Sequence, residues 1–171
     1  MKRAGFQVSL IGDSDADATT VAVAFEIGAM LAELGAILIT GGGAGTMQAA
    51  CRGARSKGGV TVAILKSADF ADANDASSIV IPTGLGHARN VVNILAGDVV
   101  IALGSSAGTI SEACFAWIQG RPILTLAGFG GWVERVAREG GVDGRRTSEV
   151  IVVDSVSELR DEIARRMAAR Q

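Results

Sequence analysis

The stretch AILITGGGAGTMQAA (Ala36–Ala50) decides the fold, because an apolar strand pattern passes there through a glycine-rich turn directly into a helix pattern. DVVIALGSSAGTISEA (Asp98–Ala113) repeats the same order of strand, turn and helix. Both turns contain Ala-Gly-Thr, but the residue three positions after the threonine is Ala49 in the first turn and Glu112 in the second. Strands this continuously apolar are typical of a parallel sheet that helices cover on both faces.

The same alternation of strand and helix patterns continues along the chain. Strands are expected at Gln7–Gly12, Ala36–Thr40, Val60–Leu65, Ser78–Pro82, Asp98–Gly104, Pro122–Gly128 and Glu149–Asp154. Helices are expected at Ala18–Leu34, Ala44–Lys57, Ala88–Leu95, Ala107–Gln119, Gly131–Arg138 and Val156–Ala169. The pattern predicts an α/β fold, a single Rossmann-like domain over residues 1–171 with a doubly wound parallel sheet of about seven strands flanked by helices.

The composition is that of a compact globular protein. Hydrophobic residues make up 49% of the chain, charged residues 20%, and the formal net charge is −2, which gives no reason to expect nucleic acid as a partner. The most apolar window, Thr19–Thr40, is divided by Gly35 into a helix pattern and a strand pattern, so we expect no membrane association. The polar-basic start Met1–Phe6 is unlike a signal peptide, and we expect a cytoplasmic protein.

The sequence offers few metal ligands of the soft or imidazole type. His87 is the single histidine, and Cys51 and Cys114 lie apart in apolar surroundings without the spacing of a zinc centre. We therefore expect no metal site and two buried, reduced thiols.

The two Ala-Gly-Thr turns and the polar residues after the first strand are candidate binding elements. Ligands of open parallel sheets bind beyond the carboxyl ends of the strands, and a helix N-terminus attracts anions. The glycines could also serve only as tight turns, and the threonines only as helix caps, but two such turns at one sheet edge favour a phosphorylated ligand. The candidate residues are Gly12, Asp13, Ser14, Gly41, Gly42, Gly43, Gly45, Thr46, Met47, Gly104, Ser105, Ser106, Gly108, Thr109 and Glu112.

Two common phosphate-binding motifs are absent from the sequence. No Gly-Lys-Ser or Gly-Lys-Thr of a P-loop occurs. The dinucleotide fingerprint G-x-G-x-x-G fails as well, since Gln48 stands where the third glycine after Gly43 and Gly45 would be. Kinase and NAD-dependent dehydrogenase activities are therefore disfavoured.

A third candidate segment, TGLGHARNVVN (Thr83–Asn93), lies between the two turns. Gly84 and Gly86 interrupt the chain and place Arg89 and Asn90 at the start of a helix. The guanidinium of Arg89 suits a phosphate or a carboxylate; the alternative is a surface arginine paired with a nearby acid. A lone histidine in a polar loop is usually only solvated, so His87 is not among the expected ligand contacts.

The segments TGGGAGTM (Thr40–Met47), GLGHARN (Gly84–Asn90) and GSSAGTISE (Gly104–Glu112), in this order, resemble the LONELY GUY superfamily of Rossmann-like proteins, once labelled lysine decarboxylases. The resemblance extends over about Val8–Val153 and is strongest to the molybdenum cofactor carrier proteins and their bacterial relatives. It implies a protein that needs no cofactor of its own, carries molybdopterin or a similar nucleotide-like phosphate as cargo, and forms a homodimer or homotetramer. Molybdoenzymes would then be its protein partners.

The same resemblance implies an alternative function, a phosphoribohydrolase that cleaves the N-glycosidic bond of nucleoside 5′-monophosphates. The motif of such members, P-G-G-x-G-T-x-x-E with an upstream Arg-Lys pair, places the catalytic roles on Glu112 and Arg89. Here Leu103-Gly104-Ser105 replaces Pro-Gly-Gly and Asn90 replaces the lysine. These departures favour binding over hydrolysis, and an enzymatic role stays open.

Overall fold

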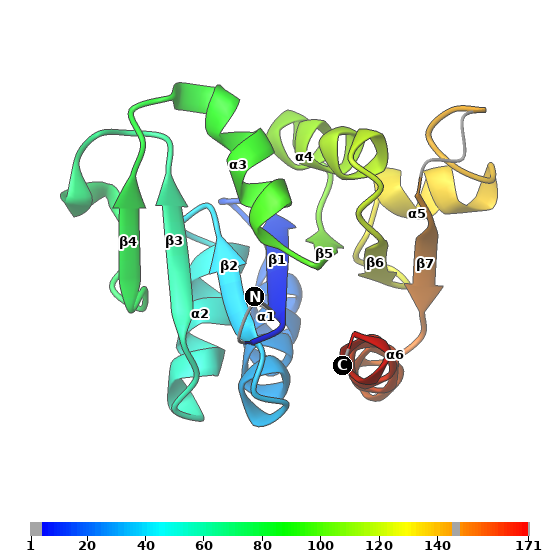
Figure 1. Ribbon diagram of the computed structural model, residues 1–171, viewed down its shortest axis with the longest axis horizontal. Helices are drawn as coiled ribbons and strands as arrows, with labels where there is room; N and C mark the ends of the chain where they lie inside the picture. The colour runs from blue at the N-terminus through cyan, green and yellow to red at the C-terminus, as the bar shows by residue number, and fades with distance from the viewer. Residues whose placement is uncertain (1–4, 145–147, 171) are drawn as a thin grey trace.

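The computed structural model describes residues 5–144 and 148–170 of the 171-residue chain, so that Met1–Ala4 of the polar-basic start lie outside the described residues. Its core is a seven-stranded, fully parallel sheet in the order β4-β3-β2-β1-β5-β6-β7 (Figure 1). The strands are β1 Gln7–Gly12, β2 Ile37–Thr40, β3 Thr61–Leu65, β4 Ile79–Pro82, β5 Val99–Leu103, β6 Ile123–Leu126 and β7 Val150–Val153. The predicted α/β fold class is confirmed.

Helices cover both faces of the sheet, and each face has its own apolar core. α1 (Ala18–Glu33), α2 (Thr46–Ser56) and α6 (Val156–Ala169) enclose one core, which includes Leu10 and Leu38. α3 (Arg89–Ala96), α4 (Ala107–Ile118) and α5 (Trp132–Arg138) enclose the other. In Figure 1, α3 crosses in front of the strands, whereas α1 and α2 lie behind them. Two short 3-10 helices, η1 (Phe70–Asp72) and η2 (Gly86–Ala88), flank β4.

The apolar excess of α1 is covered by α2 at very close range. A Cβ atom added at Gly28 of α1 would lie 1.9 Å from the carbonyl oxygen of Ala50, and one added at Gly53 of α2 would lie 1.9 Å from that of Phe25. Only glycine allows two helix backbones to approach so closely. The second apolar side of α1 is therefore largely buried within one chain.

The strand β4 differs from its prediction. Continuous apolarity predicts burial on both faces, and β5, in the middle of the sheet, is buried at every position. In β4, however, Ile79 is 48% and Ile81 45% exposed. The prediction is wrong for this strand because β4 forms the sheet edge and α3 crosses away from it toward β5 (Figure 1).

The structure shows where Trp117 lies and how the apolar window Thr19–Thr40 is divided. Trp117, for which the sequence allows either a core or an interface position, is 1% exposed, and its indole N–H donates to Asp143 Oδ1 at 3.1 Å. The apolar window separates into α1 and β2 as expected. Within residues 5–144 and 148–170, no helix has the length and apolarity needed to cross a bilayer.

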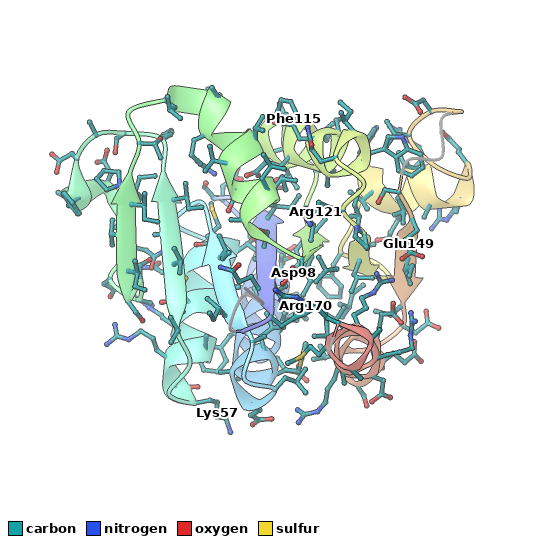
Figure 2. All side chains as sticks on the ribbon, viewed as in Figure 1. Lys57, Asp98, Phe115, Arg121, Glu149 and Arg170 are labelled. Carbon is teal, nitrogen blue, oxygen red and sulfur yellow. The ribbon has the colours of Figure 1, made fainter. Side chains whose placement is uncertain are left out.

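Ion pairs gather at the amino ends of the strands, opposite the carboxyl ends. Arg170, after α6, lies 2.6 Å from Asp98 (Figure 2). Arg170 also stacks over the Phe6 ring, and Arg166 lies 2.6 Å from Glu149. The basic residues of α6 therefore neutralise nearby acids and do not form an unpaired positive stripe. Arg145 and Arg146, the other late basic residues, lie outside the described part of the chain.

Candidate functional site

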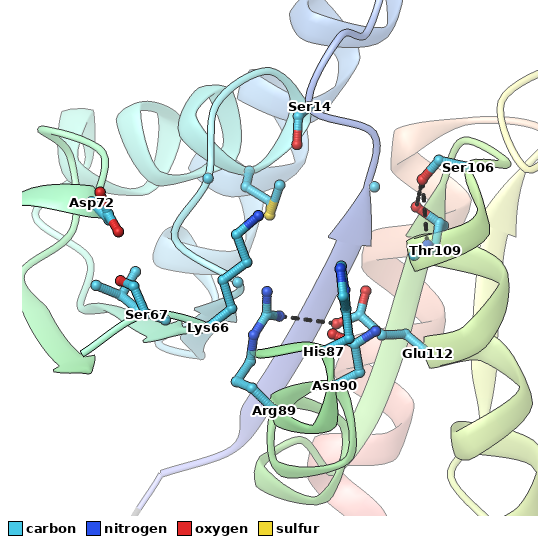
Figure 3. Close-up of a pocket in the computed structure, with 16 residues that line it drawn as sticks. Ser14, Lys66, Ser67, Asp72, His87, Arg89, Asn90, Ser106, Thr109 and Glu112 are labelled. Atoms are coloured by element: carbon cyan, nitrogen blue, oxygen red, sulfur yellow. Dashed lines mark hydrogen bonds and ion pairs between the residues drawn. The ribbon is translucent and has the colours of Figure 1, made fainter. Parts of the chain in front are cut away.

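A cavity of about 380 Å³ opens at the carboxyl ends of the central strands. Its position is the topological switch point of the sheet, where β1 pairs with β2 on one side and with β5 on the other, and where connections diverge to opposite faces. The wall combines both Ala-Gly-Thr turns, the end of β3 and the start of α3 (Figure 3). It is formed by Gly12, Ser14, Gly41, Gly43, Met47, Leu65, Lys66, Ser67, Asp72, His87, Arg89, Asn90, Ser106, Gly108, Thr109 and Glu112.

Asp13, directly after β1, joins the two turns. Its backbone carbonyl accepts hydrogen bonds from the backbone N–H of Thr46 at 3.1 Å and from the Thr46 hydroxyl at 2.9 Å. Gly45, just before Thr46, has φ +59, and a Cβ atom there would lie 2.6 Å from the same Asp13 oxygen. The first turn is thus packed directly on the backbone of the β1 loop.

The carboxylate of Asp13 binds the second turn. It accepts from the backbone N–H groups of Ser105 and Ser106, each at 3.0 Å, and from the Thr109 hydroxyl at 2.8 Å. Burial acts to raise the pKa of Asp13, but these hydrogen bonds outweigh it and hold the pKa below its ordinary value. Asp13 is therefore an ionised carboxylate at neutral pH and occupies donors of the second turn.

The two threonines act neither as helix caps nor as free donors in this structure. Thr46 donates to the Asp13 carbonyl, and Thr109 to the Asp13 carboxylate. α4 is instead capped by Ser106, whose Oγ accepts from the Thr109 backbone N–H at 3.4 Å. The near-identical Ala-Gly-Thr sequences therefore serve as two anchors for one aspartate.

Hydrogen bonds fix the backbone of the first turn beside the cavity. The Gly42 N–H donates to Thr40 Oγ1 at 3.1 Å, and Asn74 holds the carbonyls of Gly42 and Gly43 through bonds of 2.8 and 3.1 Å. Only glycine fits at position 41, because a Cβ atom there would lie 2.6 Å from Arg89 Nη1. The turn is thus fixed by hydrogen bonds, with Gly41 and Gly42 buried and Gly43 half-buried at the cavity wall.

Arg89 and Glu112 meet at the floor of the cavity. Arg89 Nη1 lies 3.2 Å from Glu112 Oε1 (Figure 3). The same oxygen accepts from Asn93 Nδ2 at 2.8 Å. The Arg89 and Glu112 side chains are only 11% and 9% exposed. Among the described residues, Arg89 Nε is buried without a partner. The pair is thus a nearly dry ion pair at the edge of a cavity.

Burial dominates the ionisation of this pair. It raises the pKa of Glu112, against the opposing effects of the Asn93 hydrogen bond and the Arg89 charge. It also lowers the pKa of Arg89, which the charge of Glu112 partly offsets. Each group therefore depends on the other to remain charged in this environment.

This fold and site can now be compared with known proteins. A family model, the SLOG cluster4 family, matches residues 5–160. The chain belongs to the SLOG cluster4 family. An uncharacterised protein of Archaeoglobus fulgidus is 41% identical to this SLOG cluster4 chain over 121 residues, 70% of this chain and 79% of that protein.

Two solved structures related to this SLOG cluster4 chain are named for the molybdenum cofactor. The molybdenum cofactor binding protein of the phototrophic bacterium Rippkaea orientalis has a TM-score of 0.85 at 32% identity, covering 95% of this chain and 98% of that one. The molybdenum cofactor carrier protein of Chlamydomonas reinhardtii has a TM-score of 0.80 at 28% identity, covering 96% and 99%. The resemblance to the LONELY GUY-like superfamily near its carrier branch is thereby confirmed.

Most of the residues predicted from the sequence lie in the cavity wall of this SLOG cluster4 protein. Asn90 is among them, and its side chain donates to Ser111 Oγ at 2.8 Å. The predicted residues outside that wall are Asp13, Gly42, Gly45, Thr46, Gly84, Gly104 and Ser105. Their place is behind or beside the wall, and a ligand contact by them stays a prediction.

Several wall residues were not predicted. Leu65, Lys66, Ser67 and Asp72 line the cavity, and so does His87, which is exposed. Lys66 and Ser67 directly follow β3, so the rule that ligands bind at carboxyl ends of strands could have found them. This short polar segment lacks the glycine pattern that marks the two turns.

Cys51 and Cys114 of the SLOG cluster4 chain are free thiols, and burial raises the pKa of both. Cys51 is buried as predicted, whereas Cys114 is only half-buried. Over residues 5–144 and 148–170, no group of three or more His, Cys, Asp or Glu side chains is placed to hold a metal ion.

Proposed function

We propose that this protein binds the molybdenum cofactor, or a closely similar pterin monophosphate, as cargo and releases it unchanged. The observation that carries the proposal is the ion pair between Arg89 and Glu112, which holds the two candidate catalytic groups against each other at 3.2 Å beside an open cavity. The names of the two solved relatives support the choice of cargo.

The phosphate of the cargo would lie on the first turn. Gly41 and Gly43 line the cavity there, and Arg89 lies directly against Gly41. Lys66 extends from the end of β3 into the same cavity (Figure 3). Two cations and bare backbone suit a phosphate group, since charge-assisted hydrogen bonds are the strong ones.

The heterocyclic part of the cargo would face the polar remainder of the wall. Ser14, Ser67 and His87 offer donors there, while Asp72 and Glu112 offer acceptors for the N–H groups of a pterin. A wall of this kind, open to solvent on one side, fits a ligand that must leave again.

Binding of the cargo can be tested by comparing two lysine variants. Lys66→Met is expected to weaken retention of molybdopterin about tenfold, because one charge-assisted hydrogen bond to the phosphate is lost. Lys57→Met is the matched control, since Lys57 is also an exposed lysine but pairs with Glu33 at 3.0 Å, away from the cavity. Retained pterin is measured by the fluorescence of its oxidised form after gel filtration. Equal retention by both variants would contradict the placement of the phosphate.

The hydrolase alternative is tested on the same preparation. Incubation with nucleoside 5′-monophosphates is expected to release no free base detectable by chromatography, because Glu112 Oε1 already accepts from Arg89 and Asn93. Base release that Glu112→Ala abolishes would make the protein a phosphoribohydrolase and overturn the carrier function.

We further propose that the protein is a cytoplasmic homodimer or homotetramer that delivers its cargo to molybdoenzymes. α3 and α4 present Val92, Leu95 and Ile118 to solvent, at 40, 42 and 49% exposure, and packing of two copies would bury them. Light scattering is expected to give at least twice the chain mass of 17.4 kDa. Val92→Lys is expected to shift the mass toward that of one chain, and a monomer at micromolar wild-type concentration would contradict the assembly.

A further inference from the structure

The second turn has the form of an anion site, yet an anion of the chain already fills it. The carboxylate oxygens of Asp13 accept from Ser105 N–H, Ser106 N–H and Thr109 Oγ1 at 2.8–3.0 Å. These are the backbone and hydroxyl donors at the N-terminus of α4 that would otherwise bind a phosphate. Ser106 and Thr109, which supply two of the three donors, line the cavity, whereas Ser105 and Asp13 lie beside its wall.

We infer that Asp13 is a specificity-determining residue: its carboxylate keeps a second phosphate out of the cavity, so that the ligand carries one phosphate, bound at the first turn. This deepens the proposed function and rests on it for the location of the first phosphate. The chemical class that follows is a monophosphate of a nucleoside or pterin, in preference to a diphosphate or a dinucleotide.

The geometry holds Asp13 firmly in this role. Its backbone carbonyl is fixed by both the N–H and the hydroxyl of Thr46, so the side chain leaves from an anchored main chain. Gly104 makes room for the carboxylate, because a Cβ atom there would lie 2.5 Å from Asp13 Cγ. The backbone at Gly104 also has φ +113, a conformation that favours glycine.

A second phosphate would face both steric and electrostatic opposition. It would have to displace Asp13 from three hydrogen bonds, or lie beside a carboxylate that is ionised at neutral pH. Like charges at close range repel strongly where burial weakens solvent screening. Among the described residues, no carboxylate accepts a hydrogen bond from the backbone of the first turn. Lys66 and Arg89 lie beside that turn, and the acids that line the cavity are Asp72 and Glu112, which is paired with Arg89.

The test compares AMP with ADP by isothermal calorimetry on the full chain. Wild-type protein is expected to bind ADP no more tightly than AMP. Asp13→Ala vacates the second turn but keeps the backbone carbonyl for Thr46, and it is expected to shift the ratio of dissociation constants toward ADP by about tenfold, the value of one added charge-assisted contact. Asp15→Ala, an exposed aspartate on the same loop, removes the same charge and is expected to leave the ratio unchanged.

Three outcomes separate the inference from the proposed function. The inference is overturned if wild-type protein binds ADP tenfold more tightly than AMP. It is also overturned if the ratio of the two dissociation constants changes equally in the Asp13→Ala and Asp15→Ala variants. Should wild-type protein bind neither nucleotide and retain no pterin, the proposed function fails. The inference is then decided by inorganic phosphate, which Asp13→Ala gains and Asp15→Ala does not. If Asp13→Ala does not fold, Asp13→Asn keeps an acceptor oxygen without the charge and is expected to shift the ratio in the same direction.

Discussion

Replacing Gly28 with alanine is expected to lower the free energy of unfolding by about 3 kcal/mol, at the upper end of overpacking effects. The new Cβ atom would lie 1.9 Å from the Ala50 carbonyl oxygen and 2.7 Å from the carbonyl carbon. Both atoms belong to the backbone of α2, so no side chain can rotate out of the way. α1 and α2 would have to move apart, which opens the apolar core that they share.

Helix propensity alone predicts the opposite sign for this substitution. Alanine is favoured over glycine in a helix by about 1 kcal/mol. Gly108 provides the matched control, since it lies in α4 and a Cβ atom there would meet only Ser106 Oγ at 3.8 Å. Gly108→Ala is expected to leave stability unchanged or slightly raised. Urea unfolding followed by far-UV circular dichroism measures both variants, and a Gly28→Ala protein as stable as wild type would contradict the close packing of these helices.

Replacing Arg89 with methionine is expected to lower the free energy of unfolding at pH 8 by about 3 kcal/mol, because a buried carboxylate loses its charged partner. Glu112 would keep the hydrogen bond from Asn93 at 2.8 Å but no cation. Its pKa, already raised by burial, would rise further. A carboxyl group whose pKa is raised by folding favours the folded state below its unfolded pKa, and this contribution is lost as pH rises through the folded pKa. The deficit of Arg89→Met is therefore expected to be smaller at pH 5 than at pH 8.

The double variant Arg89→Met/Glu112→Gln separates the charge effect from simple loss of packing. Glutamine is neutral and can still accept from Asn93, so most of the lost stability is expected to return. The two substitutions would then be strongly non-additive, as expected for residues in direct contact. Urea unfolding at the two pH values measures this coupling. Additive effects, or a deficit that does not change with pH, would show that the ion pair contributes little.

The fold could be predicted because each local pattern agrees with the global one. The apolar strands, the glycine turns and the helices that follow them all appear where the sequence places them. Arg89 and Glu112, from two of the predicted helices, meet near the carboxyl ends of the strands. The burial of β4 is an exception, because its apolar sequence does not reveal that it lies at the edge of the sheet. Order within a sheet depends on long-range pairing, which periodicity does not encode.

The roles within the site were harder to predict than its location. Asp13 and Thr109 could be assigned to the site from their position after strands, but not to each other, because their side chains lie 96 positions apart in the chain. Lys66 was missed since one lysine in a polar loop has no pattern of its own. A donor at a turn can serve a ligand or a residue of the same chain, and only the three-dimensional arrangement distinguishes these uses.

The central position of β1 has a consequence for folding during synthesis on the ribosome. β1 pairs with β2 through nearby residues, Val8 with Leu38, but its other edge pairs with β5, where Val8 meets Val99. Until β5 has been synthesised, the middle strand of the sheet has an open edge, and Asp13 has no second turn to bind. Pairings of such long sequence separation slow folding, and open strand edges favour aggregation. The edge of β1 that faces β5 therefore stays open while the first half of the chain is being made.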